Sequence, residues 1–284
     1  MQRAVFLIMI CILLSAGCLI SGPTQAEEIQ VITPGEGLSL YDNQMIYTTI
    51  IGQTTPDIKA NYSMGEVVIQ AGNATPLHRL TGSTEFVYLI SGEAGIQCDN
   101  STTTLRKGQA ALLPEGVLQS IKAVGDSELR YINAIQPPYS AAVEISGDEL
   151  TGLMTDGVPI VIPDPENSTT WGDYESANIY TMLNPALMAE LKTPISYSVA
   201  YARLLPGGSV RANSLNGASE VIYVISGEIE VFTPDGDAIR VPAGSAVYIP
   251  PDHVKGYRNV GESGSEVLSV VDPAWTPERT VMAE

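Results

Sequence analysis

Four side chains at matched positions could support metal or hydrogen-bond chemistry: His78 and Glu85, and further along the chain Asn213 and Glu220. An imidazole and a carboxylate are common ligands of divalent metals, and the same two groups form a hydrogen bond when no metal is present. The sequence contains two histidines, His78 and His253, so it cannot supply three imidazoles to one metal ion.

These residues belong to a pattern that occurs twice, Gly-x5-[His/Asn]-x-Leu-x4-Glu-x6-Gly followed by Gly-x5-Pro. The copies are separated by 135 residues at the glutamates and by 136 at the prolines. The matched residues are Gly72, His78, Leu80, Glu85, Gly92, Gly108 and Pro114, and then Gly207, Asn213, Leu215, Glu220, Gly227, Gly244 and Pro250. Seven matches at nearly one spacing predict a tandem repeat of one domain.

Short runs rich in Val, Ile, Tyr and Phe predict that each repeat is built from β-strands. We expect strands at 85–90, 95–98, 110–113 and 131–135, and again at 220–225, 228–232, 246–249 and 267–271. Ser-Gly-Glu between the first two runs of each copy predicts a β-hairpin. Side chains alternate along a strand, so Glu85 and Val87 would face a pocket while Phe86 and Tyr88 face away. Because both faces are apolar, we expect the face opposite the pocket to pack against the other repeat or another subunit.

The length of 284 residues suits two domains that each bury a core. We expect a leader at 1–28, a first domain at 29–145 and a second at 146–284. An Asn-Pro start and a late Lys predict a short helix at 184–192, leading into the second domain. The net charge of −18 argues against nucleic acid and anionic membrane surfaces as partners, and leaves a small or cationic partner open.

The leader predicts export and attachment to a membrane. Arg3 precedes an apolar run from Ala4 to Leu14, and the five residues 14–18 resemble a lipobox, in which Cys18 would be lipidated. Cleavage after Ala26 by an ordinary signal peptidase, or an uncleaved N-terminal membrane helix, stays open. All three alternatives place the rest of the chain outside the cytoplasm, with the membrane reached only through the N-terminal anchor.

Cysteine usage and sequons add two minor expectations. Cys98 would be the only thiol of the mature domains, which excludes an internal disulfide, and we interpret it as a buried, inert side chain. Asn-x-Ser/Thr sequons, which would accept glycans in a glycosylating host, begin at Asn61, Asn73, Asn100 and Asn167.

The spacing of the repeated residues resembles the cupin superfamily, and specifically a bicupin with two tandem domains. The resemblance implies two jelly-roll β-barrels, which makes the chain an all-β protein with an N-terminal signal or anchor helix. Metal-binding cupins use three histidines and one glutamate on the inner wall of the barrel. The corresponding residues here are His78, Leu80, Glu85 and Gln119 in the first repeat, and Asn213, Leu215, Glu220 and Lys255 in the second.

In the first pocket, His78, Glu85 and the amide oxygen of Gln119 could hold one weakly bound divalent metal completed by water. The alternative is a metal-free pocket in which His78 and Glu85 form a hydrogen-bonded pair and Gln119 is satisfied nearby. Most of the imidazole ligands are missing, so we favour the metal-free alternative and no cofactor.

In the second pocket, Lys255 would repel a metal ion and offer Glu220 a counter-ion, so we expect a buried ion pair in place of the metal. His253 and Tyr257 would share the face of Lys255. Three nearby arginines, Arg203, Arg211 and Arg258, could create a site for a carboxylate or an acidic sugar, or could be solvated surface charges.

The pattern therefore favours a non-catalytic bicupin that binds a sugar or organic acid, or that serves a role at the cell surface. The alternative is a metal-dependent oxygenase or isomerase that uses the first pocket. A third alternative is a structural protein whose apolar strand faces form a homo-oligomer. No sequence motif of hydrolases, nucleotide-binding proteins or Cys-x-x-Cys redox proteins is present.

Overall fold

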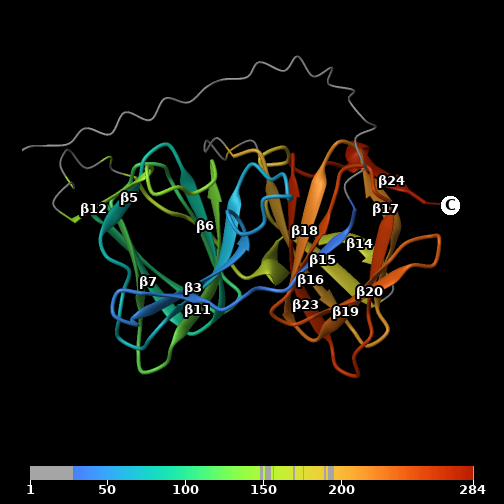
Figure 1. The fold of residues 1–284 in the computed structure, drawn as a ribbon, viewed down its shortest axis with the longest axis horizontal. Helices are drawn as coiled ribbons and strands as arrows, with labels where there is room; N and C mark the ends of the chain where they lie inside the picture. The colour runs from blue at the N-terminus through green and yellow to red at the C-terminus, as the bar shows by residue number, and fades with distance from the viewer. Residues whose placement is uncertain are drawn as a thin grey trace, which may run out of the picture.

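The computed structural model describes residues 28–283, apart from 148–149, 151–154, 156, 169, 175, 189 and 191–194. The regular structure in this part is almost all β-strand and forms two sandwiches that lie side by side (Figure 1). Each sandwich combines a seven-stranded and a five-stranded antiparallel sheet. This arrangement confirms the expected all-β fold with two tandem jelly-roll domains.

The first sandwich contains twelve strands. In spatial order its larger sheet holds β13 (Ile160–Ile162), β9 (Ala110–Leu113), β6 (Thr84–Ser91), β11 (Leu129–Gln136), β4 (Ser63–Ile69), β3 (Met45–Ile51) and β2 (Leu38–Leu40). Its smaller sheet holds β12 (Glu144–Ser146), β5 (His78–Leu80), β10 (Gln119–Ala123), β7 (Glu93–Cys98) and β8 (Ser101–Arg106).

The second sandwich repeats this plan. Its larger sheet holds β1 (Gln30–Ile32), β21 (Ala246–Ile249), β18 (Ser219–Ser226), β23 (Ser265–Asp272), β16 (Ser198–Leu204), β15 (Ala177–Leu183) and β14 (Thr170–Tyr174). Its smaller sheet holds β20 (Ala238–Pro242), β19 (Glu228–Phe232), β22 (Lys255–Asn259), β17 (Ser209–Leu215) and β24 (Thr280–Met282). Two 3-10 turns, η2 (Pro165–Asn167) and η3 (Pro277–Arg279), lie outside the sheets.

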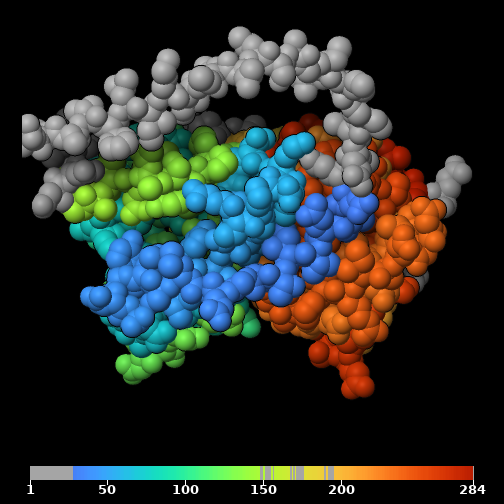
Figure 2. Space-filling model, viewed as in Figure 1, coloured from blue at the N-terminus to red at the C-terminus, as the bar shows by residue number. Residues whose placement is uncertain are grey.

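The two halves exchange edge strands. The predicted domain boundary at residue 146 did not include this exchange. Strand β1 precedes the first sandwich in sequence but pairs with β21 of the second. Strand β13 follows the first sandwich and pairs back onto β9. In Figure 2 the N-terminal residues, coloured blue, accordingly extend across the junction onto the second half. Each sandwich therefore completes its larger sheet with a strand from beyond its own repeat.

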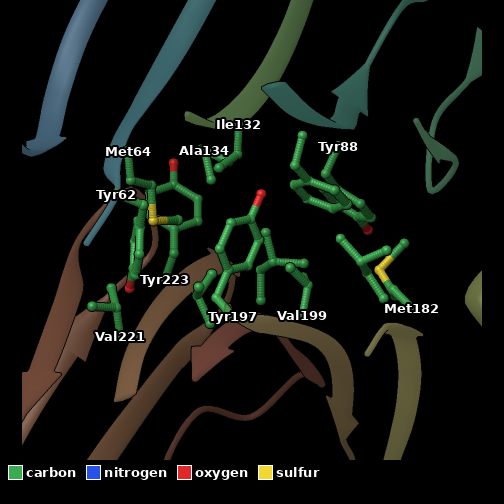
Figure 3. Packing of buried hydrophobic residues seen from close by; sticks show 14 of the residues in the cluster. Tyr62, Met64, Tyr88, Ile132, Ala134, Met182, Tyr197, Val199, Val221 and Tyr223 are labelled. Carbon is green, nitrogen blue, oxygen red and sulfur yellow. The ribbon is translucent and has the colours of Figure 1, made fainter. Parts of the chain in front are cut away.

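The largest hydrophobic cluster lies between the two sandwiches, where the larger sheets face one another. Figure 3 shows its centre, in which aromatic side chains of both halves interleave. The tilted rings of Tyr62 and Tyr197 have centroids 5.5 Å apart, and Tyr88 stacks against Tyr201 at 6.3 Å. The prediction that Phe86 and Tyr88 pack against the other repeat is therefore confirmed.

Polar side chains also join the halves: the exposed Ser196 bonds to the buried Gln136 and Asp272. Ser196 donates its Oγ hydrogen to Asp272 Oδ1 at 2.7 Å. The side chain of Gln136 donates to Ser196 Oγ at 2.7 Å and accepts from the backbone N–H of Ser196 at 2.7 Å. Gln136 and Asp272 occupy equivalent places, because each precedes a cis proline at the end of the closing strand of its repeat. One serine thus connects the two repeats at their matched corners.

The expected hairpins are wrong, although the predicted strands are present. Strand β6 pairs with β9 and β11 in the larger sheet, whereas β7 pairs with β8 and β10 in the smaller one. The chain crosses between sheets at Gly92, whose φ is +83° and whose added Cβ would lie 2.6 Å from the carbonyl oxygen of Glu128. Only glycine combines this backbone conformation with so close an approach. The Ser-Gly-Glu signal therefore marks a sheet-to-sheet crossing rather than a hairpin turn.

The helix expected at 184–192 is absent from the described part of that segment, which forms a turn. Asn184 begins it as predicted: its Oδ1 accepts from the backbone N–H groups of Ala186 and Leu187. One helical hydrogen bond follows, from Met188 N to Asn184 O at 2.8 Å. Asn184 Nδ2 donates to the carbonyl oxygen of Trp275, so the cap residue is also tied to the second sandwich. A capping signal thus begins one helical turn at 184–188.

The leader, with Cys18, lies outside the described residues. Among the residues that are described, no helix has the length and apolar character needed to cross a bilayer. Cys98 is buried with a free thiol, and burial, with Asp99 and Glu85 nearby, raises the pKa of that thiol to about 12. A thiol held in its neutral form is a poor nucleophile, which agrees with the expectation of an inert side chain.

Candidate functional site

Four strands bring the polar residues of the first pocket together. His78 lies on β5 directly opposite Gln119 on β10, because the two residues are register partners in the smaller sheet. Glu85 on β6 faces them from the larger sheet, and Asn133 lies on the neighbouring strand β11. Leu80 is buried two residues after His78. Three of the four residues that the sequence assigned to this pocket, His78, Glu85 and Gln119, thus lie within hydrogen-bonding distance of a neighbour in the set, and Leu80 follows on β5.

The carboxylate of Glu85 is held by two amide groups. Gln119 Nε2 donates to Glu85 Oε2 at 2.6 Å, and Asn133 Nδ2 donates to Glu85 Oε1 at 2.9 Å. Gln119 Nε2 also lies 3.2 Å from His78 Nε2, while His78 Nδ1 lies 2.9 Å from the carbonyl oxygen of Pro76. Because Pro76 O can only accept, the ring carries its hydrogen on Nδ1, and Nε2 accepts from Gln119. The expected direct pairing of His78 and Glu85 is thus replaced by a bridge through Gln119.

A metal ion does not fit this arrangement. The amide nitrogen of Gln119 bonds the two atoms that would have to ligate a metal, His78 Nε2 and Glu85 Oε2. It uses both of its hydrogens to do so, and turning the amide over would place its oxygen against the carboxylate. Among the described residues, no three His, Cys, Asp or Glu side chains cluster as a metal site would require. The Gln119 amide oxygen, proposed from the sequence as a ligand, is therefore directed away from the two others.

Burial shapes the electrostatics of the first pocket. Desolvation raises the pKa of Glu85, and the hydrogen bonds from Asn133 and Gln119 counteract that shift. Burial, with a smaller contribution from Glu85, raises the pKa of Tyr47 to about 12. Tyr131 is fully buried, and its pKa is also raised, first by burial and then by Glu85. Burial thus opposes a negative charge on Glu85, Tyr47 and Tyr131.

The second pocket contains the expected buried ion pair. Lys255 on β22 is the register partner of Asn213 on β17. Its Nζ lies 2.8 Å from Glu220 Oε2 and 2.9 Å from Asn213 Oδ1. The other carboxylate oxygen of Glu220 accepts from Ser269 Oγ at 2.6 Å. The Lys255 side chain is only 3% exposed, so its charge is neutralised inside the barrel rather than by solvent.

Beside this ion pair lies a cavity of about 110 Å³. The polar residues in its wall include Asn213, Glu220 and Lys255, and most of the remaining wall is apolar. The other lining residues are Ile179, Thr181, Asn184, Ser198, Val199, Ala200, Ala202, Val210, Leu215, Tyr257, Ser269, Val271, Trp275 and Thr280. Strand β24 and the segment before it thus help to enclose the cavity, through Thr280 and Trp275.

The structure separates the remaining candidates of the second pocket. Tyr257 lines the cavity together with Lys255, as expected, but His253 precedes β22 and does not line it. His253 Nδ1 lies 3.0 Å from the carbonyl oxygen of Pro251, so the residue belongs to the turn before the strand. Arg203 pairs with Glu166 and Glu266 at the surface, and Arg258 pairs with Glu230. Neither arginine lines the cavity, and nor does Arg211, so Lys255 is the only cation that the described residues place in its wall.

Two residues of the sites were missed from the sequence, Asn133 and Ser269. They occupy the same place in the two repeats, and each donates a hydrogen bond to the motif glutamate. A signal was available, because Asn133 interrupts the apolar run 131–135 and Ser269 interrupts the run 267–271 at the matched position. A polar residue in the middle of a strand that is buried on both faces requires an internal partner.

Comparisons with known proteins agree with this geometry. An uncharacterised protein of Methanocaldococcus jannaschii is 28% identical over 78 residues, which are 28% of this chain and 62% of that protein. Protein SchB of Streptomyces halstedii is 32% identical over 74 residues, 26% of this chain and 54% of that protein. The chain therefore spans about half to three-fifths of the curated relatives it matches.

Solved structures match over both sandwiches. Oxalate decarboxylase of Bacillus subtilis is similar with a TM-score of 0.68 at 15% identity, covering 92% of this chain and 79% of that one. The coconut allergen cocosin gives 0.67 at 12% identity, covering 87% of this chain and 86% of that one. At these identities the likeness concerns the fold alone. The family described as "Cupin domain" matches residues 65–135 and 200–271, which together make up half of the chain, so this protein belongs to the cupin family as a bicupin.

Proposed function

We propose that this bicupin binds a small organic molecule in its second barrel without a metal ion, while its first barrel serves as a closed structural domain. The observation that carries the proposal is the cavity of about 110 Å³ against the Lys255–Glu220 ion pair. In the first barrel, Gln119 bridges His78 and Glu85 and satisfies both.

The walls of the cavity define the kind of molecule that fits. A cavity of about 150 Å³ lined by apolar residues binds benzene, so the smaller space here suits a ligand of a few heavy atoms rather than a hexose. Lys255 and Glu220 neutralise one another, which leaves no net charge to attract a strong anion. In place of the sugar or organic acid expected from the sequence, we therefore propose a small, mainly apolar ligand that carries a hydrogen-bond acceptor.

We place this activity outside the cytoplasm, with the chain anchored through Cys18. The support is the order of the leader: Arg3, the apolar run 4–14 and then the lipobox-like residues that end at Cys18. Growth of expressing cells with a labelled fatty acid tests it. The full chain should carry label in the membrane fraction, and Cys18→Ala should lose it. Export without label would favour ordinary cleavage near Ala26.

A ligand screen tests the proposed binding function. The purified chain is screened by ligand-observed NMR against small alcohols, amides, ketones and acids, alongside Ala200→Leu, which fills the cavity, and Ala238→Leu, a control at an exposed strand position. Binding should be lost in Ala200→Leu and kept in Ala238→Leu. A ligand that binds all three proteins equally would show that the cavity is not the site.

Elemental analysis of the same samples tests the competing metalloenzyme. A first-row metal should be substoichiometric. One tightly held ion per chain that is lost in His78→Ala would overturn the metal-free proposal and make the first pocket the active site.

A further inference from the structure

The second barrel places one primary amine in the wall of a mainly apolar cavity. In the part of the chain that the structure describes, Lys255 is the only lysine that lines the cavity, and its side chain is 3% exposed. An ammonium group has three hydrogens, and the described residues give Lys255 Nζ two partners, Glu220 Oε2 and Asn213 Oδ1. One N–H direction is therefore unused by the protein at a group that borders an empty space.

We infer that Lys255 captures a small aldehyde or ketone as an imine, an inference that rests on the proposed binding function and names its ligand class. A primary amine in the wall of a cavity is suited to this reaction, because a bound carbonyl compound is held next to the nucleophile. The carboxylate 2.8 Å away supplies the proton acceptor that the ammonium needs before it can attack.

The reaction balances within the ion pair. Lys255 gives one proton to Glu220, and its nitrogen then forms a bond to the carbonyl carbon, which produces a carbinolamine. Glu220 returns a proton to the carbinolamine oxygen, the C–O bond breaks, and water leaves. The product is a protonated imine beside a carboxylate. No oxidant, metal or other co-reactant takes part.

Charge conservation makes this chemistry compatible with a buried site. The cation at position 255 and the anion at Glu220 are both present before and after the reaction, so no uncompensated charge is left inside the barrel. Ser269 Oγ keeps its bond to the second oxygen of Glu220 throughout and holds the carboxylate in place. The first barrel has Gln119 at the corresponding position and cannot form an imine, since an amide nitrogen is not nucleophilic.

Reductive trapping tests the inference. The full chain is incubated with propanal and sodium cyanoborohydride, which reduces an imine to a stable propyl-lysine, and the sites are mapped by peptide mass spectrometry. Lys255 should be labelled at carbonyl concentrations that leave the exposed Lys122 unmodified. Labelling confined to exposed lysines and the N-terminus would overturn the inference.

Three variants and one spectroscopic measurement give the trapping experiment its controls. Lys255→Arg keeps the cation but has no primary amine, so the cavity label should vanish, whereas Lys122→Arg should keep it. Glu220→Gln should slow labelling at Lys255, because the proton acceptor is gone. Should these variants fail to fold, propanal labelled with ¹³C at the carbonyl must show an imine resonance on the unmodified protein, and its absence refutes the inference.

The screen for reversible ligands separates this inference from the proposed function. Ligands that bind in the cavity while propanal, acetone and butanone all leave Lys255 unlabelled would retain the binding function and remove the imine. If neither binding nor labelling occurs in the unmodified protein, both proposals fail.

Discussion

Removal of the Lys255 ammonium alone should lower the free energy of unfolding more than removal of both charges of the ion pair. Lys255→Met leaves the Glu220 carboxylate buried with one remaining donor, Ser269. Breaking a buried pair from one side costs about 3–5 kcal/mol, because the surviving charge is uncompensated. Glu220→Gln should cost a similar amount, since the buried Lys255 ammonium then has only neutral acceptors, the amide oxygens of Asn213 and of the introduced glutamine.

The double variant tests whether this cost belongs to the unpaired charge. With Lys255→Met and Glu220→Gln together, no charge is buried, and the glutamine oxygen can still accept from Ser269. We expect the double variant to lose about 1–3 kcal/mol, the range for imperfectly satisfied buried polar groups, and not the sum of the single losses. The difference is a coupling energy of about 3 kcal/mol or more, beyond the range typical of surface ion pairs.

Urea unfolding at neutral pH measures the cycle, followed by tyrosine fluorescence and far-UV circular dichroism. Coincident transitions by both signals are required, because the two sandwiches share a large core and should unfold together. Coupling below about 0.5 kcal/mol would refute the reasoning, since additive single losses are the behaviour of independent, solvated charges. The same result would remove the electrostatic basis of the proposed imine.

Three other predictions use matched positions. Gly92→Ala should lower the free energy of unfolding in urea more than Gly108→Ala does. Both glycines have φ near +85°, but only at Gly92 would an added Cβ lie 2.6 Å from a carbonyl oxygen. Equal losses of stability would refute this prediction. Tyr223→Phe should lose about 1.5–3 kcal/mol, since the hydroxyl donates to Glu66, whereas Tyr197→Phe should be neutral or stabilising, because within the described residues the buried Tyr197 hydroxyl has no partner. The pKa of Glu85 is raised in the folded state, so its contribution to the free energy of unfolding is present at acid pH and is lost as the pH rises through the pKa of the folded state. Glu85→Gln should remove this loss of stability with rising pH. An unchanged dependence of stability on pH would contradict the prediction.

The sequence predicted the strands well because each of them is a buried run with a clear boundary. The matched glycines and prolines located the repeats, and alternation along 85–90 identified which face forms the junction. Pairing was less accessible, because Ser-Gly-Glu has the composition of a hairpin turn. Whether the chain turns back or crosses to the other sheet depends on the approach of Glu128 to Gly92, a contact between residues far apart in sequence.

The sequence predicted some contacts within the two pockets and missed others. Lys255 and Glu220 were expected to pair, because two opposite charges inside one barrel have few other partners. The bridge made by Gln119 was not expected, since it depends on the direction of an amide that carries both donors and an acceptor. The cavity could not have been predicted, because a void of about 110 Å³ is the small difference between large packed volumes.

The two barrels keep the same glutamate and neutralise it in different ways. Glu85 accepts hydrogen bonds from two side-chain amides, and the described residues place no cation within hydrogen-bonding distance of it. Glu220 is bound by the hydroxyl of Ser269 and the ammonium of Lys255, and an ammonium can transfer a proton to the carboxylate with which it is paired. An amide bridge can only hold a fold together, whereas an ion pair next to a cavity can also exchange a proton. The second barrel is for this reason the half of the chain in which chemistry should be sought.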